Sequence, residues 1–493
     1  MKDLTVRVRY APSPTGFQHI GGVRTALFNY LFARANNGTF ILRIEDTDRT
    51  RYSEEALEDI YETFDWLGFK WDEGPDVGGP YGPYFQSQRL ELYQEYAKKL
   101  VESGNAYYCY CTPERLERIR KIQLANKMAP GYDRHCRNLT PEERAEYEKQ
   151  GIKPVIRFKI PLEGKTTFHD ELLGDIVTPN EDINPDPVLL KSDGYPTYHL
   201  ANVIDDHLMQ ITHIMRAQEW IPSGPLHVLL YRAFGWEPPK YCHLPMVMGK
   251  DGQKLSKRHG ATSVREFRKQ GYLPEALINY VALLGWSYND TQEIFSLKEL
   301  EKVFTMERLN KAPAVFDYKK LEWFNGVYIR KRPQEEIKEL IMPYLIDEGV
   351  VSNPPTEREL AIVEGAVPLI QERMRLLSDA PKLLRFLFKV VEYNPDEVIP
   401  KKLNRQQVLE VLKEVRKIVE GFDKRSDEEN EKIFRELADK FGFKLGDVLM
   451  PLRVAITGTR VSPPLFGSIK LLGVEKSLER IDRVIELLSK ENV

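Results

Sequence analysis

The 493-residue sequence has few cysteines and no long apolar run. Its four cysteines are too few for a disulfide framework in a chain of this length, and in a cytosolic protein they are more often metal ligands or free thiols. No segment approaches the roughly 20 consecutive apolar residues that a membrane-spanning helix requires. The first residues, MKDLTVRVRY, lack the apolar core of a signal peptide. We therefore predict a cytoplasmic protein without a membrane segment, whose mature chain begins at this methionine.

The sequence also lacks a strong net charge of either sign. A formal charge of -3 at pH 7 does not point to a nucleic-acid partner for the molecule as a whole. Basic residues are concentrated locally, because residues 249–270 hold seven basic side chains and two acidic ones. A local cluster of this kind can bind phosphates on a mildly acidic protein. A hydrophobic content of 42% and a charged content of 29% are typical of a globular protein.

The N-terminal segment has the pattern of a strand, a helix and a second strand. Val6–Ala11 is short, partly β-branched and followed by a Pro-Ser-Pro-Thr-Gly turn. Apolar residues then recur at helical spacing up to Asn36-Asn37-Gly38, and a second apolar run, Phe40–Ile44, ends in Glu-Asp-Thr-Asp. This βαβ pattern predicts an α/β fold with an open parallel sheet of Rossmann type. A ligand should bind beyond the carboxyl ends of its strands.

The composition and hydrophobic spacing of the rest of the chain change along its length, and the length of the whole chain favours roughly three to four domains. Three of the four cysteines and a strand pattern at residues 156–160 lie in a segment that resembles an insertion into the sheet. The sheet is expected to resume with Val188-Leu189-Leu190 and Ala201–Ile204, and the later residues have helical spacing, for example Val408, Val411, Leu412 and Val415. The predicted regions are 1–106 and 188–250 for the two halves of the sheet domain, 107–187 for an α+β insertion, 251–330 for a connecting region and 331–493 for an all-helical part.

Two segments have the composition of phosphate-binding elements. His19-Ile20-Gly21-Gly22 opens the first helix, where glycines allow close approach of a ligand and free N–H groups attract anions. Lys254-Leu255-Ser256-Lys257-Arg258 lies in a glycine-containing basic loop that can neutralise the charge of a leaving pyrophosphate. Each segment alone is also compatible with an ordinary turn or a solvated loop. Their pairing at the strand ends of one sheet favours a common nucleotide site.

This pair resembles the HIGH and KMSKS motifs of class I aminoacyl-tRNA synthetases. The segments Arg9–Gly16 (RYAPSPTG), Arg43–Asp48 (RIEDTD) and Tyr195–Asn202 (YPTYHLAN) resemble bacterial glutamyl-tRNA synthetases in particular, and the similarity extends over the whole chain. Gly22 stands where most class I enzymes have a second histidine, a departure that is itself typical of the glutamyl branch.

The resemblance implies a function for each part of the site. The catalytic and ATP-binding residues would be Gly16, His19, Gly21, Gly22, Glu219, Lys254, Ser256 and Lys257. Glutamate needs buried cations for its side-chain carboxylate, and arginine suits planar carboxylates. The resemblance assigns this task to Arg9 and Arg216, places Glu45 opposite the α-ammonium group, and makes Ser13, Tyr198 and Asn202 orienting residues.

The implied reaction needs no nucleophilic side chain. The glutamate α-carboxylate attacks the α-phosphorus of ATP, and a terminal ribose hydroxyl of tRNA then takes the acyl group, so that catalysis consists of positioning and charge stabilisation, with Mg²⁺ on the phosphates. The insertion would bind the acceptor end of the tRNA, residues 251–330 its stem, and the helical part its anticodon. The partners would be ATP, L-glutamate and tRNA(Glu), with tRNA(Gln) left open, and the protein would be a monomer.

Three cysteines form a candidate metal site. Cys109 and Cys111 are followed by Cys136, and Tyr132 and His135 are candidates for the fourth ligand of a zinc ion. Some glutamyl enzymes bind zinc through a similar Cys-x-Cys, Tyr and Cys pattern, which favours Tyr132. Three reduced thiols without a metal are the alternative. Cys242 has no partner in the sequence and is expected to be a packing residue.

Other functions remain compatible with parts of this pattern. A nucleotidyltransferase would share the His-x-Gly element but would need neither the arginine pocket nor the helical C-terminal part. A short glutamyl-transferring paralogue that modifies a tRNA base would lack the anticodon-binding region. A non-catalytic RNA-binding relative would have no use for His19, Lys254 and Lys257.

Overall fold

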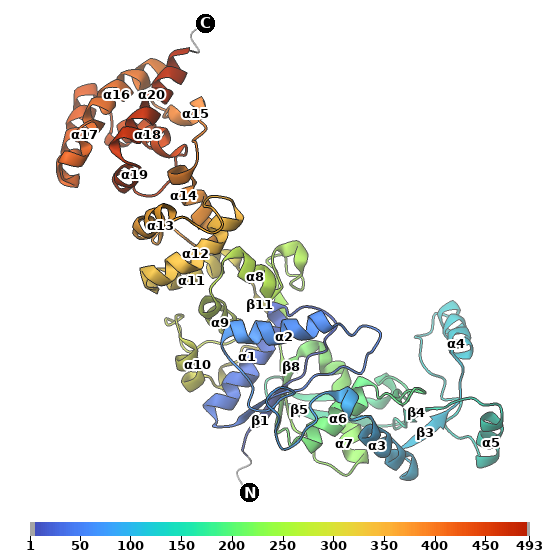
Figure 1. The fold of residues 1–493 in the computed structure, drawn as a ribbon. Helices are drawn as coiled ribbons and strands as arrows, with labels where there is room; N and C mark the ends of the chain where they lie inside the picture. Colours follow the sequence, from blue (N-terminus) through green and yellow to red (C-terminus); the bar gives the residue numbers. More distant parts are fainter. Residues whose placement is uncertain (1–4, 491–493) are drawn as a thin grey trace. The chain divides into compact units, whose positions relative to one another are not determined.

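The computed structural model describes residues 5–490 and divides the chain into two compact units (Figure 1). The first comprises the residues up to Phe267 together with Leu277–Tyr318, and the second comprises Arg268–Ala276 and the residues from Lys319 onward. Residues 1–4 and 491–493 belong to the predicted first and last regions and lie outside the described part. Among the described helices, none combines the length and the apolar character that crossing a membrane requires.

The first unit contains the predicted βαβ element. Strand β1 (Arg7–Tyr10) is followed by helix α1 (Ile20–Ala35) and by β2 (Thr39–Leu42), which pairs with β1 in parallel. The helix is buried over most of its length, so its apolar residues pack on the sheet rather than form a single amphipathic stripe. The expectation of a parallel sheet that begins with this element is confirmed.

The sheet continues from β1 to β8 (His213–Ala217). The backbone N–H of Thr212, immediately before β8, donates to the carbonyl of Arg7 at 2.9 Å. Strand β9 (Lys240–Leu244) pairs with β8 in parallel, and β5 (Lys165–Asp170) pairs with β9 at one position, Asp170 opposite Tyr241. The hairpin partner β6 (Gly174–Pro179) forms the outer edge. A hairpin from the segment predicted as the insertion therefore belongs to the same sheet as β8 and β9.

Two expectations about this sheet are wrong. Val188–Leu190 is strand β7, but it pairs antiparallel with β4 (Val155–Phe158) and not with the parallel strands. Residues 201–204 lie in helix α6 (Tyr198–Leu208). The apolar runs correctly indicated burial. A short run of this kind carries no information about the partner of a strand, and alone it does not separate a buried strand from a buried helix.

A small antiparallel sheet carries the cysteines. Strand β3 (Ala106–Cys109) pairs with β4, and β4 pairs with β7. Helices α4 (Pro113–Ala125) and α5 (Pro141–Lys149) begin at the threonine caps Thr112 and Thr140, each followed by a proline, and neither has a buried residue. These helices form an exposed part of the segment 107–187.

The first unit also contains a pair of short strands and further helices. The short strands β10 (Val247–Met248) and β11 (Ala314–Val315) pair in parallel, and the basic loop follows β10. The helices are α2 (Glu54–Leu67), α3 (Leu90–Glu102), α7 (Gly224–Ala233), α8 (Val264–Gln270), α9 (Pro274–Ala282) and α10 (Leu297–Val303), of which α8 and α9 extend across the division between the units.

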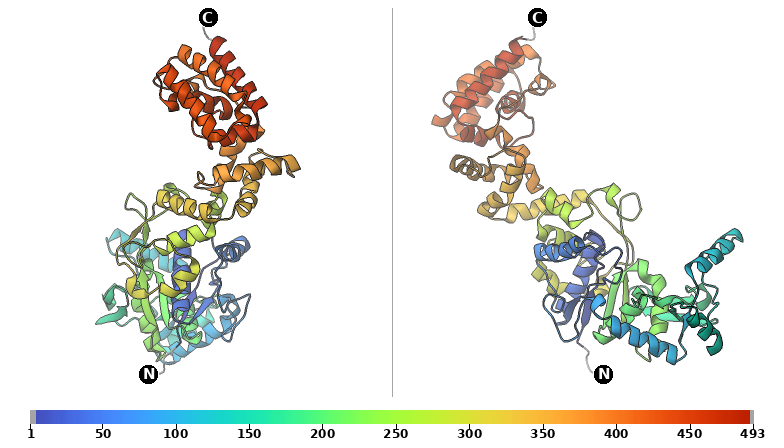
Figure 2. Two further views of the ribbon diagram at one scale, coloured as in Figure 1. Left: turned by 90° about the vertical axis from the view of Figure 1, so that its left-hand side faces the viewer. Right: turned by 45° about the vertical axis from the view of Figure 1, so that its right-hand side comes forward.

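The described part of the second unit has helices and no strand (Figure 2). The predicted apolar positions Val408, Val411, Leu412 and Val415 are all fully buried in α16 (Arg405–Val419). The other helices are α11 (Tyr318–Lys331), α12 (Gln334–Asp347), α13 (Glu357–Ile370), α14 (Ala380–Phe388), α15 (Pro395–Val398), α17 (Asp427–Phe441), α18 (Leu445–Thr457), α19 (Leu465–Leu472) and α20 (Val474–Lys490).

Candidate active site

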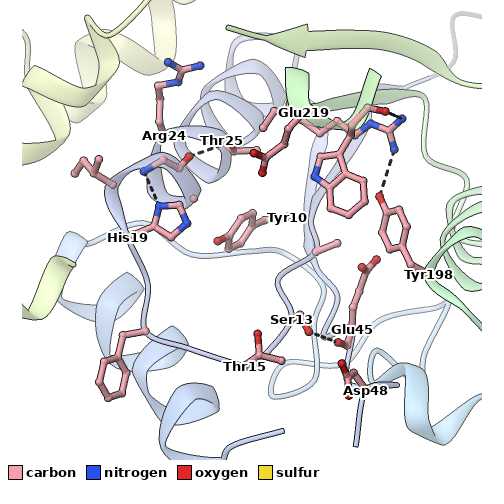
Figure 3. A pocket seen from close by; sticks show the side chains of 18 of the residues that line it. Tyr10, Ser13, Thr15, His19, Arg24, Thr25, Glu45, Asp48, Tyr198 and Glu219 are labelled. Carbon is pink, nitrogen blue, oxygen red and sulfur yellow. Dashed lines mark hydrogen bonds between the residues drawn. The ribbon is translucent and has the colours of Figure 1, made fainter. Parts of the chain in front are cut away.

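A crevice of about 1380 Å³ opens at the carboxyl ends of β1, β2 and β8. Figure 3 shows His19 on one side and Glu45 and Tyr198 on the other, with Tyr10 between them. Gly16 does not line the crevice, although its neighbours Thr15 and Phe17 do. The lining contains every other predicted catalytic, ATP-binding and glutamate-binding residue: Arg9, Ser13, His19, Gly21, Gly22, Glu45, Tyr198, Asn202, Arg216, Glu219, Lys254, Ser256 and Lys257.

His19 caps the N-terminus of α1. The Nδ1 atom of His19 accepts a hydrogen bond from the N–H of Gly21 at 3.2 Å. Burial, and then the charge of Lys254, lower the pKa of His19, so that the ring is neutral near pH 7 and its proton is on Nε2. His19 can therefore donate one hydrogen bond into the crevice.

Gly22 has a packing reason to be glycine. A Cβ atom at this position would lie 2.7 Å from the hydroxyl of Tyr10, which itself donates to Gln18 at 2.7 Å. Any side chain at residue 22 would displace Tyr10 from the floor of the crevice. This contact explains why a second histidine is not accommodated here.

The basic loop is attached to the start of α1. His19 and Ser263 form an antiparallel backbone bridge, and the N–H of Ile20 donates to the carbonyl of Thr262 at 2.9 Å. Within the loop, the Lys254 ammonium group contacts Glu219 at 2.6 Å. The two phosphate-binding elements predicted from the sequence are therefore adjacent, and both face the crevice.

The opposite wall contains a buried network of ionised side chains. Arg9 makes two hydrogen bonds to Asp206, at 2.9 and 3.1 Å, and Arg43 contacts the same carboxylate at 2.7 Å. Arg43 also donates to Glu45 at 3.1 Å. Burial raises the pKa of Glu45, whereas Arg9 and Arg43 hold the pKa of Asp206 below its ordinary value against the effect of burial.

Glu45 is held by two predicted site residues. The hydroxyl of Ser13 donates to the backbone carbonyl of Glu45 at 3.0 Å, and the Asn202 amide is 3.5 Å from its carboxylate. Both Glu45 and Asn202 are buried. A carboxylate fixed in this way can oppose a substrate ammonium group.

Arg216, at the end of β8, contacts neutral groups. It donates to the Tyr198 hydroxyl at 3.3 Å, to His243 at 3.0 Å and to the carbonyl of Trp220 at 3.4 Å. Sequence analysis gave no role to His243 or Asp206, and it named Arg43 only as part of the RIEDTD motif. The one available signal was the pair of adjacent aspartates, Asp205 and Asp206, inside an apolar helix, since buried carboxylates require cationic partners.

The cysteines lie apart from the crevice, at the end of β3. The sulfur atoms of Cys109, Cys111 and Cys136 lie within 4.8 Å of one another, and the last two are 3.6 Å apart. The Tyr132 hydroxyl is 3.3 Å from the Cys109 sulfur, whereas His135 is exposed and outside the cluster. Cys242 is buried in β9, as a packing residue would be.

Comparison with known proteins identifies both units. Residues 5–323 match the family model "tRNA synthetases class I (E and Q), catalytic domain", and residues 336–485 match the model "Anticodon binding domain". The chain is 59% identical over 486 residues to a glutamate–tRNA ligase from Borreliella burgdorferi, with 98% of this chain and 99% of that one covered. A second, from Treponema denticola, is 57% identical over 502 residues, with the same coverage.

A solved structure has the same fold. The crystal structure of a glutamate-tRNA synthetase from Elizabethkingia anophelis superposes with a TM-score of 0.86 at 37% identity, covering 98% of this chain and all of that one.

The lowered pKa of His199 predicts that the folded protein loses stability at acidic pH. Burial, and then the charge of Arg216, lower the pKa of His199 from 6.5 to about 4. Between these values the unfolded chain binds a proton that the folded chain excludes. The contribution of His199 is therefore complete above its unfolded pKa, and it is lost as the pH falls from about 6.5 to about 4, by at most about 1.4 kcal/mol per pH unit.

Urea denaturation of the wild type and of His199→Gln, at about pH 7.5 and about pH 5, measures this contribution. Glutamine keeps a hydrogen-bond acceptor for His227, which contacts His199 at 3.0 Å. The variant should lose less stability on acidification than the wild type. An equal loss in both proteins would contradict the prediction.

Proposed function

The chain belongs to the class I tRNA synthetases for glutamate and glutamine, and on that premise we propose roles for its residues in the reaction of the glutamate enzymes. That reaction is the ATP-dependent activation of L-glutamate to glutamyl-adenylate, followed by transfer of the glutamyl group to the 3′-terminal ribose of tRNA. The observation that carries the assignment is the identity of 59% over nearly the whole chain with a glutamate–tRNA ligase. The buried arginines in the crevice agree with an acidic amino acid.

Glutamate binds with its side-chain carboxylate at Arg9 and Arg216. Both guanidinium groups are buried, at 4% and 5% exposure, and both line the crevice. Glu45 opposes the α-ammonium group, and Ser13, Tyr198 and Asn202 orient the substrate. An uncharged glutamine side chain would leave a buried cation without a counter-ion, which costs several kcal/mol.

ATP binds between the start of α1 and the basic loop. His19 donates from Nε2 to a phosphate, while the absence of side chains at Gly21 and Gly22 lets the same anion approach the start of α1 closely. Lys254, Ser256 and Lys257 bind the remaining phosphates, and Gly16 and Glu219 complete the nucleotide site. A Mg²⁺ ion bound with the phosphates of ATP would neutralise part of their charge.

The chemical step is an in-line displacement. An oxygen of the glutamate α-carboxylate forms a bond to the α-phosphorus, and the bond from that phosphorus to the bridging oxygen of pyrophosphate breaks. A ribose hydroxyl of the tRNA then attacks the activated carbonyl, and AMP leaves. The residues of the crevice hold the reactants in place and stabilise the charge that develops on the leaving group.

The tRNA uses three parts of the chain. The segment 107–187 binds the acceptor end, residues 251–330 the stem, and residues 331–493 the anticodon. The match of residues 336–485 to an anticodon-binding family supports the last assignment. The helical second unit also argues against the short paralogue that modifies a tRNA base. The protein is proposed to act as a monomer in the cytoplasm, as the resemblance to bacterial glutamyl-tRNA synthetases implies.

The three cysteines and Tyr132 are the residues that would hold a zinc ion. Four-coordinate zinc binds sulfur at about 2.3 Å, which places two ligand sulfur atoms about 3.8 Å apart. The separation of 3.6 Å between Cys111 and Cys136 fits this geometry. Tyr132 supplies the fourth donor atom. Such a zinc ion would stabilise the end of β3, remote from the reacting atoms.

Charging assays with labelled glutamate test the assignment. Purified tRNA(Glu) and tRNA(Gln) are offered separately, and tRNA(Glu) should accept glutamate. Charging of tRNA(Glu) alone identifies a discriminating enzyme, and charging of both identifies an indirect route to glutaminyl-tRNA. Failure with both, for folded protein with ATP and Mg²⁺, would refute the assignment and leave the non-catalytic RNA-binding relative.

The proposed phosphate contact of Lys257 predicts a loss of rate. Lys257→Ala should lower kcat for charging by about 10²–10³, because one donor to the developing charge is removed. The KM for glutamate should change little. Lys250→Ala is the matched control, since Lys250 belongs to the same loop but pairs with Asp317 at 2.9 Å. Equal losses in both variants would contradict a specific role of Lys257.

Metal analysis tests the zinc site. The purified protein should contain about one zinc ion per chain, and Cys136→Ser should remove it. Cys242→Ser, at a buried cysteine outside the cluster, should keep the metal. Absence of zinc from the wild-type protein after zinc-supplemented purification would leave three reduced thiols as the correct interpretation.

A further inference from the structure

The two arginines of the pocket differ in how their charge is compensated. Arg9 makes two hydrogen bonds to the carboxylate of Asp206. Arg216, by contrast, donates only to uncharged acceptors, and within residues 5–490 no carboxylate lies within 4.0 Å of its guanidinium group. Arg216 is 5% exposed, so solvent replaces little of the missing counter-charge. Arg216 is therefore the cation that most requires an anionic ligand.

The hydrogen bonds determine the tautomer of His243. Its Nδ1 atom is 2.7 Å from the Asp170 carboxylate, and its Nε2 atom is 3.0 Å from Nε of Arg216. A guanidinium group only donates, and an ionised carboxylate only accepts. The single proton of a neutral His243 must therefore be on Nδ1, and its Nε2 lone pair must face Arg216. Burial lowers the pKa of His243, which supports the neutral ring.

A second imidazole has the same orientation. Nη1 of Arg216 lies 3.3 Å from Nδ1 of His227, whose Nε2 atom is 3.0 Å from Nδ1 of His199. By the same reasoning, His227 accepts from Arg216 and donates to His199. Burial first, and then Arg216, lower the pKa values of His227 and His199. Two neutral acceptors thus fix the plane of Arg216 without compensating its charge.

Asp170 is held in place by the hairpin that contributes it. It is fully buried at the end of β5, where it faces Tyr241 of β9. Its Oδ1 atom accepts from the N–H groups of Leu172 and Leu173 at 3.0 and 2.9 Å, and its Oδ2 atom accepts from the backbone N–H of His243 at 2.9 Å. The β5–β6 hairpin thereby reaches the pocket through Asp170, His243 and Arg216.

We propose that Asp170 and His243 are positioning residues that hold Arg216 as an uncompensated, correctly oriented cation, and that they thereby set the preference for glutamate over glutamine. The inference rests on the proposed binding of the glutamate side chain by Arg216. A neutral acceptor orients the guanidinium group and leaves its charge for the substrate. A carboxylate in direct contact would neutralise that charge and weaken the discrimination against an amide.

Asp170→Asn is the first variant. The asparagine amide can donate to Nδ1 of His243, which moves the proton to Nε2, where it opposes the N–H of Arg216. The KM for glutamate in ATP–pyrophosphate exchange, with tRNA present, should rise about 10- to 100-fold, as for a lost hydrogen bond to a charged group. The preference for glutamate over glutamine should fall, while kcat and the KM for ATP should stay within about twofold.

A double-mutant cycle separates positioning from a structural role. His243→Leu should raise the KM for glutamate similarly, and Asp170→Asn should add nothing in that background, because Asp170 acts through His243. His243→Gln should recover part of the affinity, since its carbonyl can accept from Arg216. Asp175→Asn is the matched control, because Asp175 pairs with His169 at 2.6 Å on the exposed side of the same hairpin. This control should leave every kinetic constant unchanged.

Arg216→Ala distinguishes failure of this inference from failure of the proposed function. If Arg216→Ala does not raise the KM for glutamate, the assignment of Arg216 to the substrate is wrong, and the positioning role falls with it. If Arg216→Ala raises this KM but Asp170→Asn and His243→Leu do not, only the positioning inference is overturned. The positioning inference would also be overturned if Asp170→Asn and His243→Leu lowered kcat, ATP affinity and thermal stability to the same extent. That result would indicate a structural role for both residues.

Discussion

The crevice depends on Asp206, a carboxylate that two buried arginines share. Asp206 is fully buried in α6, and it joins Arg9 of β1 to Arg43, which follows β2. Taking three ionised groups out of water is costly, and the mutual attraction offsets that cost only when the geometry is good and the remaining hydrogen bonds are made. The strands and the helix must therefore meet in one arrangement. Because Arg43 also contacts Glu45, this arrangement fixes the side chains at both ends of the proposed amino-acid pocket.

The proposed phosphate side of the crevice is held together by backbone hydrogen bonds instead. The bridge between His19 and Ser263 and the hydrogen bond from Ile20 to Thr262 join the start of α1 to the segment that follows the basic loop. These backbone contacts hold the segment next to the loop, from which the lysine side chains extend. In the proposed amino-acid pocket charge is thus buried, paired at Arg9 and uncompensated at Arg216. On the proposed phosphate side it is exposed on the lysine side chains of the loop.

The sequence predicted those parts of the structure that local pattern encodes. The βαβ element followed from periodicity and turn residues, the helical second unit from apolar spacing, and the proximity of His19 to the basic loop from the rule that ligands bind at strand ends. The strand 188–190 was assigned to the wrong sheet, because an apolar run does not show which strand it pairs with. His243, Asp170 and Asp206 were missed for a related reason. Their importance comes from contacts with residues far away in the chain, and no local spacing reports such contacts.

The hairpin β5–β6 has a consequence for modular exchange between enzymes of this family. A segment exchanged between residues 107 and 187 would not be a self-contained module. Its removal would take strand β5 away from β9, and it would leave behind strand β7, the partner of β4. The piece that could be transplanted as a whole is discontinuous in sequence, since it ends before Lys165 and resumes at Val188. Recombination that ignores this boundary would remove Asp170, the carboxylate that contacts His243, together with the surface proposed to bind the tRNA acceptor end.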